Sequence, residues 1–191
     1  MKFMKLALAV MFVFALMVGS VCEAALAETV DNGAELARVK RLAIGYPDYF
    51  KTLEKEPTTD ELLNAIYDAS KVSHSNITSY DDMATKIKRD TGVDIKVIPK
   101  MEARKLFKEH VYKYADAYLV VTIANNARVS MFCDVYAVNT NERIYSIQIQ
   151  TGKGEDSKTT KAYKAMAEEF YKAFDKAVQT ETKKESKKDK N

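Results

Sequence analysis

Cys133 and Asp134 are neighbours whose residue types could belong to an active site, because a thiolate is a nucleophile and a carboxylate can support a base. Both lie in RVSMFCDVYAVNTNERIYSIQIQTG, residues 128–152, which alternates apolar and polar residues around a turn as a β-hairpin does. Successive side chains of a strand point to opposite faces of the sheet. Cys133 then shares an apolar face with Met131 and Val135. Asp134 points the other way, so we predict a structural cysteine rather than a catalytic pair.

Residues that could bind a metal ion or a cofactor are few. The chain has two histidines, His74 and His110, and no Cys-x-x-Cys or His-x-x-x-His spacing, so it lacks the ligands of a closed zinc site. The acidic pairs at 81–82 and 168–169 are expected at a helix start or on a solvated face, whereas glycoside cleavage needs two carboxyls across a cleft. Residues 151–161 contain glycine and lysine without phosphate-loop spacing and predict a flexible loop. We predict no catalytic residue, no metal and no cofactor.

The loop GYPDYF, residues 45–50, carries the candidate binding residues. It places Tyr46, Tyr49 and Phe50 next to the end of an expected strand, where loops commonly carry function. These three aromatic side chains are predicted to bind a small molecule or a polymer. The alternative interpretation is that the loop folds back and covers the core.

The elements that would position these residues follow an export signal. Residues 1–27 have a short positive start, an apolar run and a small-x-small ending at Ala25-Leu26-Ala27, and they predict a signal peptide cleaved before Glu28. An uncleaved anchor is the alternative. Cys22 raises the further alternative of lipid attachment, although GSVC is a poor match to a lipoprotein signal. We expect an exported chain, periplasmic or extracellular, in which Cys133 is the one remaining cysteine.

Charge argues against nucleic acid as a partner. The formal net charge is +3, and the lysines of the signal and of the tail at 180–191 account for it, so the folded body is near neutral. Nothing has the basic footprint of a nucleic-acid binder. The Lys-rich tail is expected to be disordered. It could touch anionic envelope polymers by charge alone, or serve only as a solubilising tail.

Hydrophobic periodicity gives the order of the elements. A linker is expected at 28–38 and a single domain at 39–179. The expected strands span 40–44, 93–98, 116–123, 128–138 and 143–150, with a loop or very short strand at 74–79, and the expected helices span 58–70, 79–91, 99–114 and 157–178. This order predicts an α+β fold, a two-layer sandwich whose mixed sheet ends in a three-stranded antiparallel meander, with helices packed on one face.

Two segments carry a resemblance to a known group of domains. They are ADAYLVV, residues 115–121, and DVYAVNTNER, residues 134–143. With the order of the elements, they resemble bacterial envelope domains such as the amino-terminal domain of the Tol-system protein TolB, the periplasmic domain of the curli channel CsgG and lipoprotein activators of penicillin-binding proteins. That group usually has a D-x-x-T-G turn, and here Asn141 stands where the glycine would be. The resemblance covers about residues 39–179 and transfers no functional residue.

The resemblance implies a non-enzymatic domain that docks to envelope proteins. We therefore expect an exported, non-catalytic interaction or accessory domain of a bacterial cell envelope, with envelope proteins as partners. One alternative is a secreted protein that binds a small molecule or polymer through the aromatic loop. Another is a hydrolase with an unrecognised site, for which the sequence has no motif. The sequence leaves the oligomeric state open.

Overall fold

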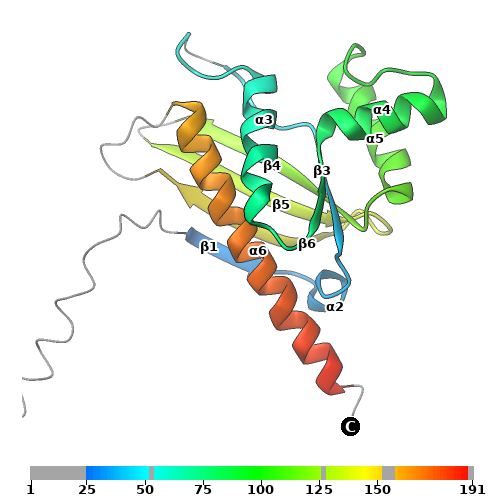
Figure 1. Cartoon of the computed structure of the whole chain (residues 1–191), viewed down its shortest axis with the longest axis vertical. Coiled ribbons are helices and arrows are strands. Elements are labelled where there is room, and N and C mark those ends of the chain that lie inside the picture. Colours follow the sequence, from blue (N-terminus) through cyan, green and yellow to red (C-terminus); the bar gives the residue numbers. More distant parts are fainter. Residues whose placement is uncertain (1–24, 52–53, 126–127, 152–157, 189–191) are drawn as a thin grey trace, which may run out of the picture.

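A computed structural model describes residues 25–51, 54–125, 128–151 and 158–188 of the chain. Its sheet has the strand order β1-β6-β5-β4-β2-β3 (Figure 1). Along this order, the neighbours β1, β6, β5 and β4 pair antiparallel. The neighbours β4, β2 and β3 pair parallel. The strands are β1 Ala25–Val30, β2 Arg41–Ile44, β3 Asn76–Thr78, β4 Ala117–Asn125, β5 Val129–Ala137 and β6 Arg143–Gln150. The helices are α2 Gly33–Leu36, α3 Thr59–Ala69, α4 Tyr80–Thr91, α5 Lys100–His110 and α6 Thr160–Lys188, with short 3₁₀ turns at Ser70–Val72 and Val111–Lys113.

The predicted meander is confirmed as β4, β5 and β6. Val121 faces Cys133, and Cys133 faces Ile147, so one face of the meander is apolar across all three strands. In the turn between β5 and β6, Asn141 has φ 56°. Asparagine tolerates this left-handed conformation, which glycine otherwise favours, so the departure from the D-x-x-T-G pattern leaves the turn possible.

Side chains at the helix starts fix where α3 and α4 begin. The Thr58 hydroxyl accepts a hydrogen bond from the Glu61 amide at 3.2 Å, and the Glu61 carboxylate accepts one from the Thr58 amide at 2.7 Å. This capping box satisfies amides that the helix itself leaves without partners. At the start of α4 the Ser79 hydroxyl accepts a hydrogen bond from the Asp82 amide, and Gly92 at φ 76° ends the helix.

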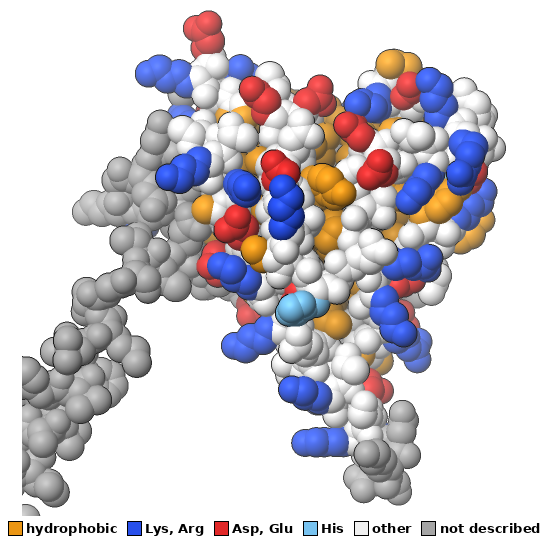
Figure 2. Space-filling view, viewed as in Figure 1, with side chains coloured by type: hydrophobic (Ala, Val, Ile, Leu, Met, Phe, Trp, Pro, Cys, Tyr) orange, Lys and Arg blue, Asp and Glu red, His pale blue; other side chains and the backbone are white. Residues whose placement is uncertain are grey.

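The helices α3 and α6 lie across one face of the sheet (Figure 1). The aromatic side chains of α6 are fully buried there, among them Phe170 and Phe174, whose rings contact Tyr145 of β6. Figure 2 views this face and shows basic and acidic side chains interspersed over the helices. It also shows hydrophobic side chains gathered between α3 and α4.

The helix α5 packs on the opposite face. Phe107 contacts Tyr118 of β4, with ring centroids 5.9 Å apart. Tyr118 and Leu119 are neighbours in one strand, so they point to opposite faces, and Leu119 pairs with Val135 on the side of α6. The α+β fold with a mixed sheet is confirmed, and α5 adds a partial cover on the second face that the sequence did not predict.

Three segments differ from the sequence prediction: the expected linker at 28–38, the expected strand at 93–98 and the expected tail at 180–191. Residues 28–38 contain the end of β1, which pairs with β6, and α2, which is capped by Asn32 and buries Leu36. Residues 93–98 form turns, because the Asp94 carboxylate accepts the Lys96 amide at 3.0 Å instead of leaving it to a strand partner. Such local bonds compete with sheet pairing.

The helix α6 continues to Lys188, through most of the expected tail. Two ion pairs at i,i+3 spacing, Lys184–Glu181 and Lys188–Glu185, support the extension. The Thr182 hydroxyl lies 3.2 Å from the Ala37 carbonyl and ties the helix to the α2 region.

Residues 1–24, with most of the predicted signal and Cys22, lie outside the described part. The predicted cleavage before Glu28 falls within β1 and would leave Glu28–Val30, which pair with Tyr145–Ile147. The signal and its cleavage stay predictions. None of the described helices is long and apolar enough to cross a membrane.

Candidate functional site

Cys133 and Asp134 form no site together. Cys133 is buried in the core, and burial raises the pKa of its thiol far above the ordinary value, with a further contribution from the Asp134 charge. The Asp134 carboxylate lies on the other face, 3.6 Å from Arg143. A buried neutral thiol is inert, because the thiolate is the reactive species.

Cys133 is therefore expected to resist maleimide at pH 8 in the folded protein and to react quickly in guanidinium chloride. The physical reason is burial together with the raised pKa. Mass spectrometry after timed labelling measures both rates. Fast labelling of the folded chain would contradict the structural role of Cys133.

Several of the other polar candidates contact neighbouring residues of the fold. Within the described residues no group of three or more potential ligands could hold a metal ion. The His74 amide donates to Asp175 at 2.6 Å. Asp81 pairs with Lys96 at 2.7 Å, and Asp82 accepts a hydrogen bond from the capping Ser79 at 2.8 Å. Of the loop at 151–161, residues 152–157 lie outside the described part.

The aromatic loop splits into three environments. Tyr49 is buried, and its hydroxyl donates to the Pro57 carbonyl at 2.6 Å. Phe50 is 77% exposed. Tyr46 lines a pocket on the second face of the sheet. The structure thus does not bring the three side chains together, and only Tyr46 lies in a pocket; their binding role stays a prediction.

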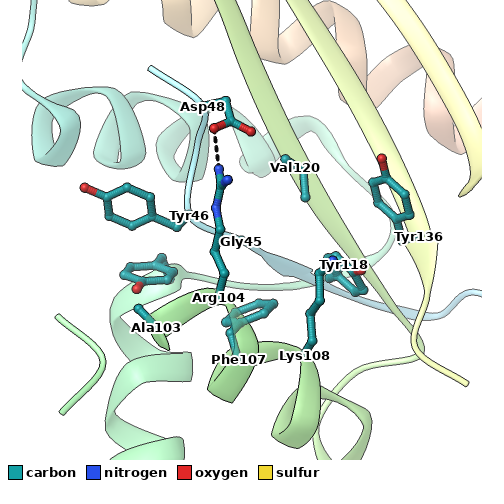
Figure 3. A pocket seen from close by; sticks show the side chains of 11 residues that line it. Gly45, Tyr46, Asp48, Ala103, Arg104, Phe107, Lys108, Tyr118, Val120 and Tyr136 are labelled. Atoms are coloured by element: carbon teal, nitrogen blue, oxygen red, sulfur yellow. Dashed lines mark ion pairs between the residues drawn. The ribbon is translucent and has the colours of Figure 1, made fainter. Parts of the chain in front are cut away.

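That pocket is a concave site built from residues of several elements. It measures about 200 Å³ and lies between α5, the β2–α3 loop and the strands β4 and β5 (Figure 3). We call it the tyrosine pocket, because four of its lining residues are tyrosines. The lining consists of Gly45, Tyr46, Asp48, Tyr80, Ala103, Arg104, Phe107, Lys108, Tyr118, Val120 and Tyr136.

An ion-pair cluster forms one side of the tyrosine pocket. Arg104 extends from α5 to Asp48, with Nη2 2.5 Å from Oδ1 (Figure 3). The Lys100 Nζ lies 3.1 Å from the same oxygen. Partial burial alone would raise the pKa of Asp48, but the two cations outweigh it and hold that pKa below its ordinary value. Asp48 is therefore ionised at neutral pH. The Lys100 ammonium also lies 5.5 Å from the centre of the Tyr46 ring.

Three tyrosines of the pocket, Tyr80, Tyr118 and Tyr136, are neutral hydroxyl groups at physiological pH. Burial raises the pKa of Tyr80 and of Tyr118 to about 12. Burial, followed by the Asp134 charge, also raises the pKa of Tyr136. A general base works best with a pKa near the operating pH. None of these three phenols meets that condition, so the tyrosines are suited to stacking and hydrogen bonding.

Tyr80 makes a specific test of the pocket wall, because its hydroxyl is buried without a hydrogen-bond partner in the described part of the chain. Tyr80→Phe is expected to leave the free energy of unfolding unchanged or to raise it by up to about 1 kcal/mol, since an unpaired buried hydroxyl is costly. Tyr49→Phe is the matched control and should lower it by about 1 kcal/mol, because that hydroxyl is bonded. Urea denaturation measures both, and a larger loss in Tyr80→Phe would show that its hydroxyl has a partner.

Sequence reasoning missed the basic side of this pocket. Lys100, Arg104 and Lys108 recur every four residues of α5 and so lie on one side of the helix. That spacing was the available signal. It could not reveal that Asp48 and the tyrosines of β4 and β5 lie across the pocket from this side of α5.

Comparison with known proteins gives no family model and no curated protein that matches this chain. Several solved structures are similar. The LpoB C-terminal domain from Escherichia coli is 13% identical over 60% of this chain and 84% of its own length, with a TM-score of 0.44. A PelC dodecamer from Paraburkholderia phytofirmans is 9% identical over 78% and 96%, with a TM-score of 0.42. A lipoprotein from Neisseria meningitidis is 11% identical over 63% and 85%, with a TM-score of 0.39.

One of these neighbours is a lipoprotein. The resemblance to the Tol-system and curli domains stays a prediction. Because the identities and TM-scores are low, no functional conclusion rests on these likenesses.

Proposed function

We propose that this protein is an exported accessory domain of a bacterial cell envelope that acts by binding and not by catalysis. The observation that carries the proposal is the tyrosine pocket, in which Asp48 pairs with Arg104 and Lys100 and the buried Tyr80 and Tyr118 stay protonated. A concave site with a few polar groups among aromatic walls is typical of binding sites.

The surface beside the pocket is also suited to a partner. Alternate residues of β5 and β6 on this face are half-buried, whereas their neighbours on the side of α6 are buried. Phe132, Asp134 and Tyr136 of β5 lie beside Ser146 and Gln148 of β6. Mixed aromatic and polar side chains are common where proteins meet.

Export and binding can be tested in intact cells. A tag after Asn191, cell fractionation and cross-linking are expected to recover the chain from the envelope fraction with one stoichiometric protein partner. Intact-mass measurement should give a chain that begins at Glu28. A cytoplasmic chain that retains Met1 would refute export, and recovery with surface polymer in place of protein would favour the alternative of a polymer-binding protein.

A further inference from the structure

We propose that the tyrosine pocket binds a small ligand that carries a carboxylate or phosphate head group on a flat, apolar body. This inference rests on the proposed binding role and specifies the chemistry of the ligand. It follows from the charge at one side of the pocket, the form of its walls and its size.

The charge of the pocket is positive. Asp48 is shared by Lys100 and Arg104, so one carboxylate offsets one of two cations. Lys108 also lines the pocket and makes no ion pair within the described residues. Three cations against one carboxylate leave an excess of two positive charges. The nearby Asp134 is not among the residues that line the pocket, and its carboxylate lies 3.6 Å from Arg143, which also pairs with Asp31 at 2.7 Å.

The two basic residues that line the pocket are placed to hold one anionic group. Arg104 and Lys108 are four residues apart on α5, and both extend from the helix toward the strands (Figure 3). A guanidinium donates in a fixed fork that matches carboxylate and phosphate oxygens. An ammonium supplies a compact second charge. An anion between them would have Asp48 on the far side of Arg104, where that carboxylate orients the guanidinium.

The remaining walls are suited to a flat body. Tyr118 and Tyr136 stack on each other with ring centroids 5.3 Å apart and an interplanar angle of 15°. Phe107 meets Tyr118 edge-on at 5.9 Å, and Val120 adds an aliphatic contact to the lining. Aromatic rings of this kind favour planar apolar groups. Tyr46 and Tyr136 have no hydrogen bond within the described part, so their hydroxyls are available to a ligand.

Other ligand classes fit the pocket less well. A divalent cation is repelled by nearby positive charge and is usually held by carboxylates, and the lining has the single carboxylate of Asp48 beside Arg104 and Lys108. An organic cation would meet the same repulsion. The volume of about 200 Å³ restricts the ligand to a small molecule or to one end group of a larger one.

The test uses small probes that separate charge from shape. The chain is purified from the cell fraction in which it accumulates, and benzoate, phenyl phosphate, benzyl alcohol and benzylamine are titrated into it and followed by protein-observed NMR. Benzoate or phenyl phosphate is expected to shift the signals of the pocket, and the tighter of the two identifies the head group. Benzyl alcohol should bind more weakly, and benzylamine should not bind. Absence of binding by both anions, or equal binding of benzylamine, would overturn the proposal.

A matched pair of variants on one helix locates the binding. Lys108→Gln is expected to lower the affinity for the anionic probe by about tenfold or more, as loss of a hydrogen bond to a charged group does. Lys105→Gln removes the same charge from α5 at a side chain that is exposed and pairs with Glu109 at 3.9 Å, so it should change the affinity by less than about twofold. Equal losses in the two variants would show non-specific attraction and overturn the proposal.

The same variants separate this inference from the proposed function. If the Lys108→Gln variant no longer binds the anionic probe but is still cross-linked to its envelope partner, the ligand site stands and the docking surface lies elsewhere. If the wild-type chain is cross-linked to a partner but binds no anionic probe, the ligand site is refuted and the docking role stands.

Discussion

Phe170→Ala is expected to lower the free energy of unfolding by about 3–5 kcal/mol, the usual cost of removing a buried phenylalanine. Phe170 is fully buried at the centre of the layer between α6 and the sheet. Its ring centroid lies 4.9 Å from that of Tyr171, 5.6 Å from that of Phe174 and 6.4 Å from that of Tyr145. Because whole domains are stable by only about 5–15 kcal/mol, this loss would remove a large part of the stability. Urea denaturation followed by circular dichroism measures it.

The matched control is Phe50→Ala, which removes the same side chain from the surface. Phe50 is 77% exposed and lies 5.0 Å from the Lys100 ammonium. An exposed cation–π contact contributes about 0.5–1 kcal/mol, so the control should cost no more than that. Similar losses in both variants would contradict the placement of Phe170 in the core.

The sequence predicted the elements whose patterns are local. Tyr163, Ala167, Phe170 and Phe174 recur at helical spacing, and all four are buried on one side of α6. The alternation around Cys133 likewise predicted which strand residues face the core. In both cases one face of a regular element is buried along its length, so periodicity alone identifies that face.

The tyrosine pocket could not be predicted in this way, because no single segment contains it. Its walls come from 45–48, from Tyr80 of α4, from 103–108 and from the meander, and the parallel pairing of β2 with β4 brings the first and last together. The aromatic loop shows the same limit. Nothing in GYPDYF indicates that Tyr49 enters the core while Phe50 stays in solvent, because tertiary neighbours decide both.

The ends of the domain also depend on contacts between distant segments. Residues 28–30 are too short a segment to predict a strand alone, and they become a strand because β6 offers an edge with which they pair. The end of α6 reads as a disordered lysine-rich tail, yet α2 packs beside it, and the Glu181 side chain lies against Gly33. A Cβ at residue 33 would collide with that carboxylate, so the Glu181 side chain would have to move to accept any other residue there.

Asp175 shows a comparable long-range contact at the other edge of the sheet. It is a buried carboxylate of α6, and it accepts hydrogen bonds from three consecutive residues before β3. The donors are the Ser73 hydroxyl at 3.0 Å, the His74 amide at 2.6 Å and the Ser75 hydroxyl at 3.2 Å. Asp175 thus holds the start of the edge strand against the helix.

Asp175→Ala is expected to lower the free energy of unfolding by about 2–4 kcal/mol, because several donors to a charged group lose their acceptor together. Asp175→Asn keeps one acceptor oxygen and should cost less. Asp68→Ala is the control: it removes a carboxylate of α3 that pairs with Lys71 at 3.2 Å and is 54% exposed, and it should cost under about 1 kcal/mol. Urea denaturation gives the three values, and hydrogen exchange should show the loss of protection concentrated at 73–78. A cost in Asp175→Ala no greater than in Asp68→Ala would mean that β3 is held by its pairing with β2 and not by this carboxylate.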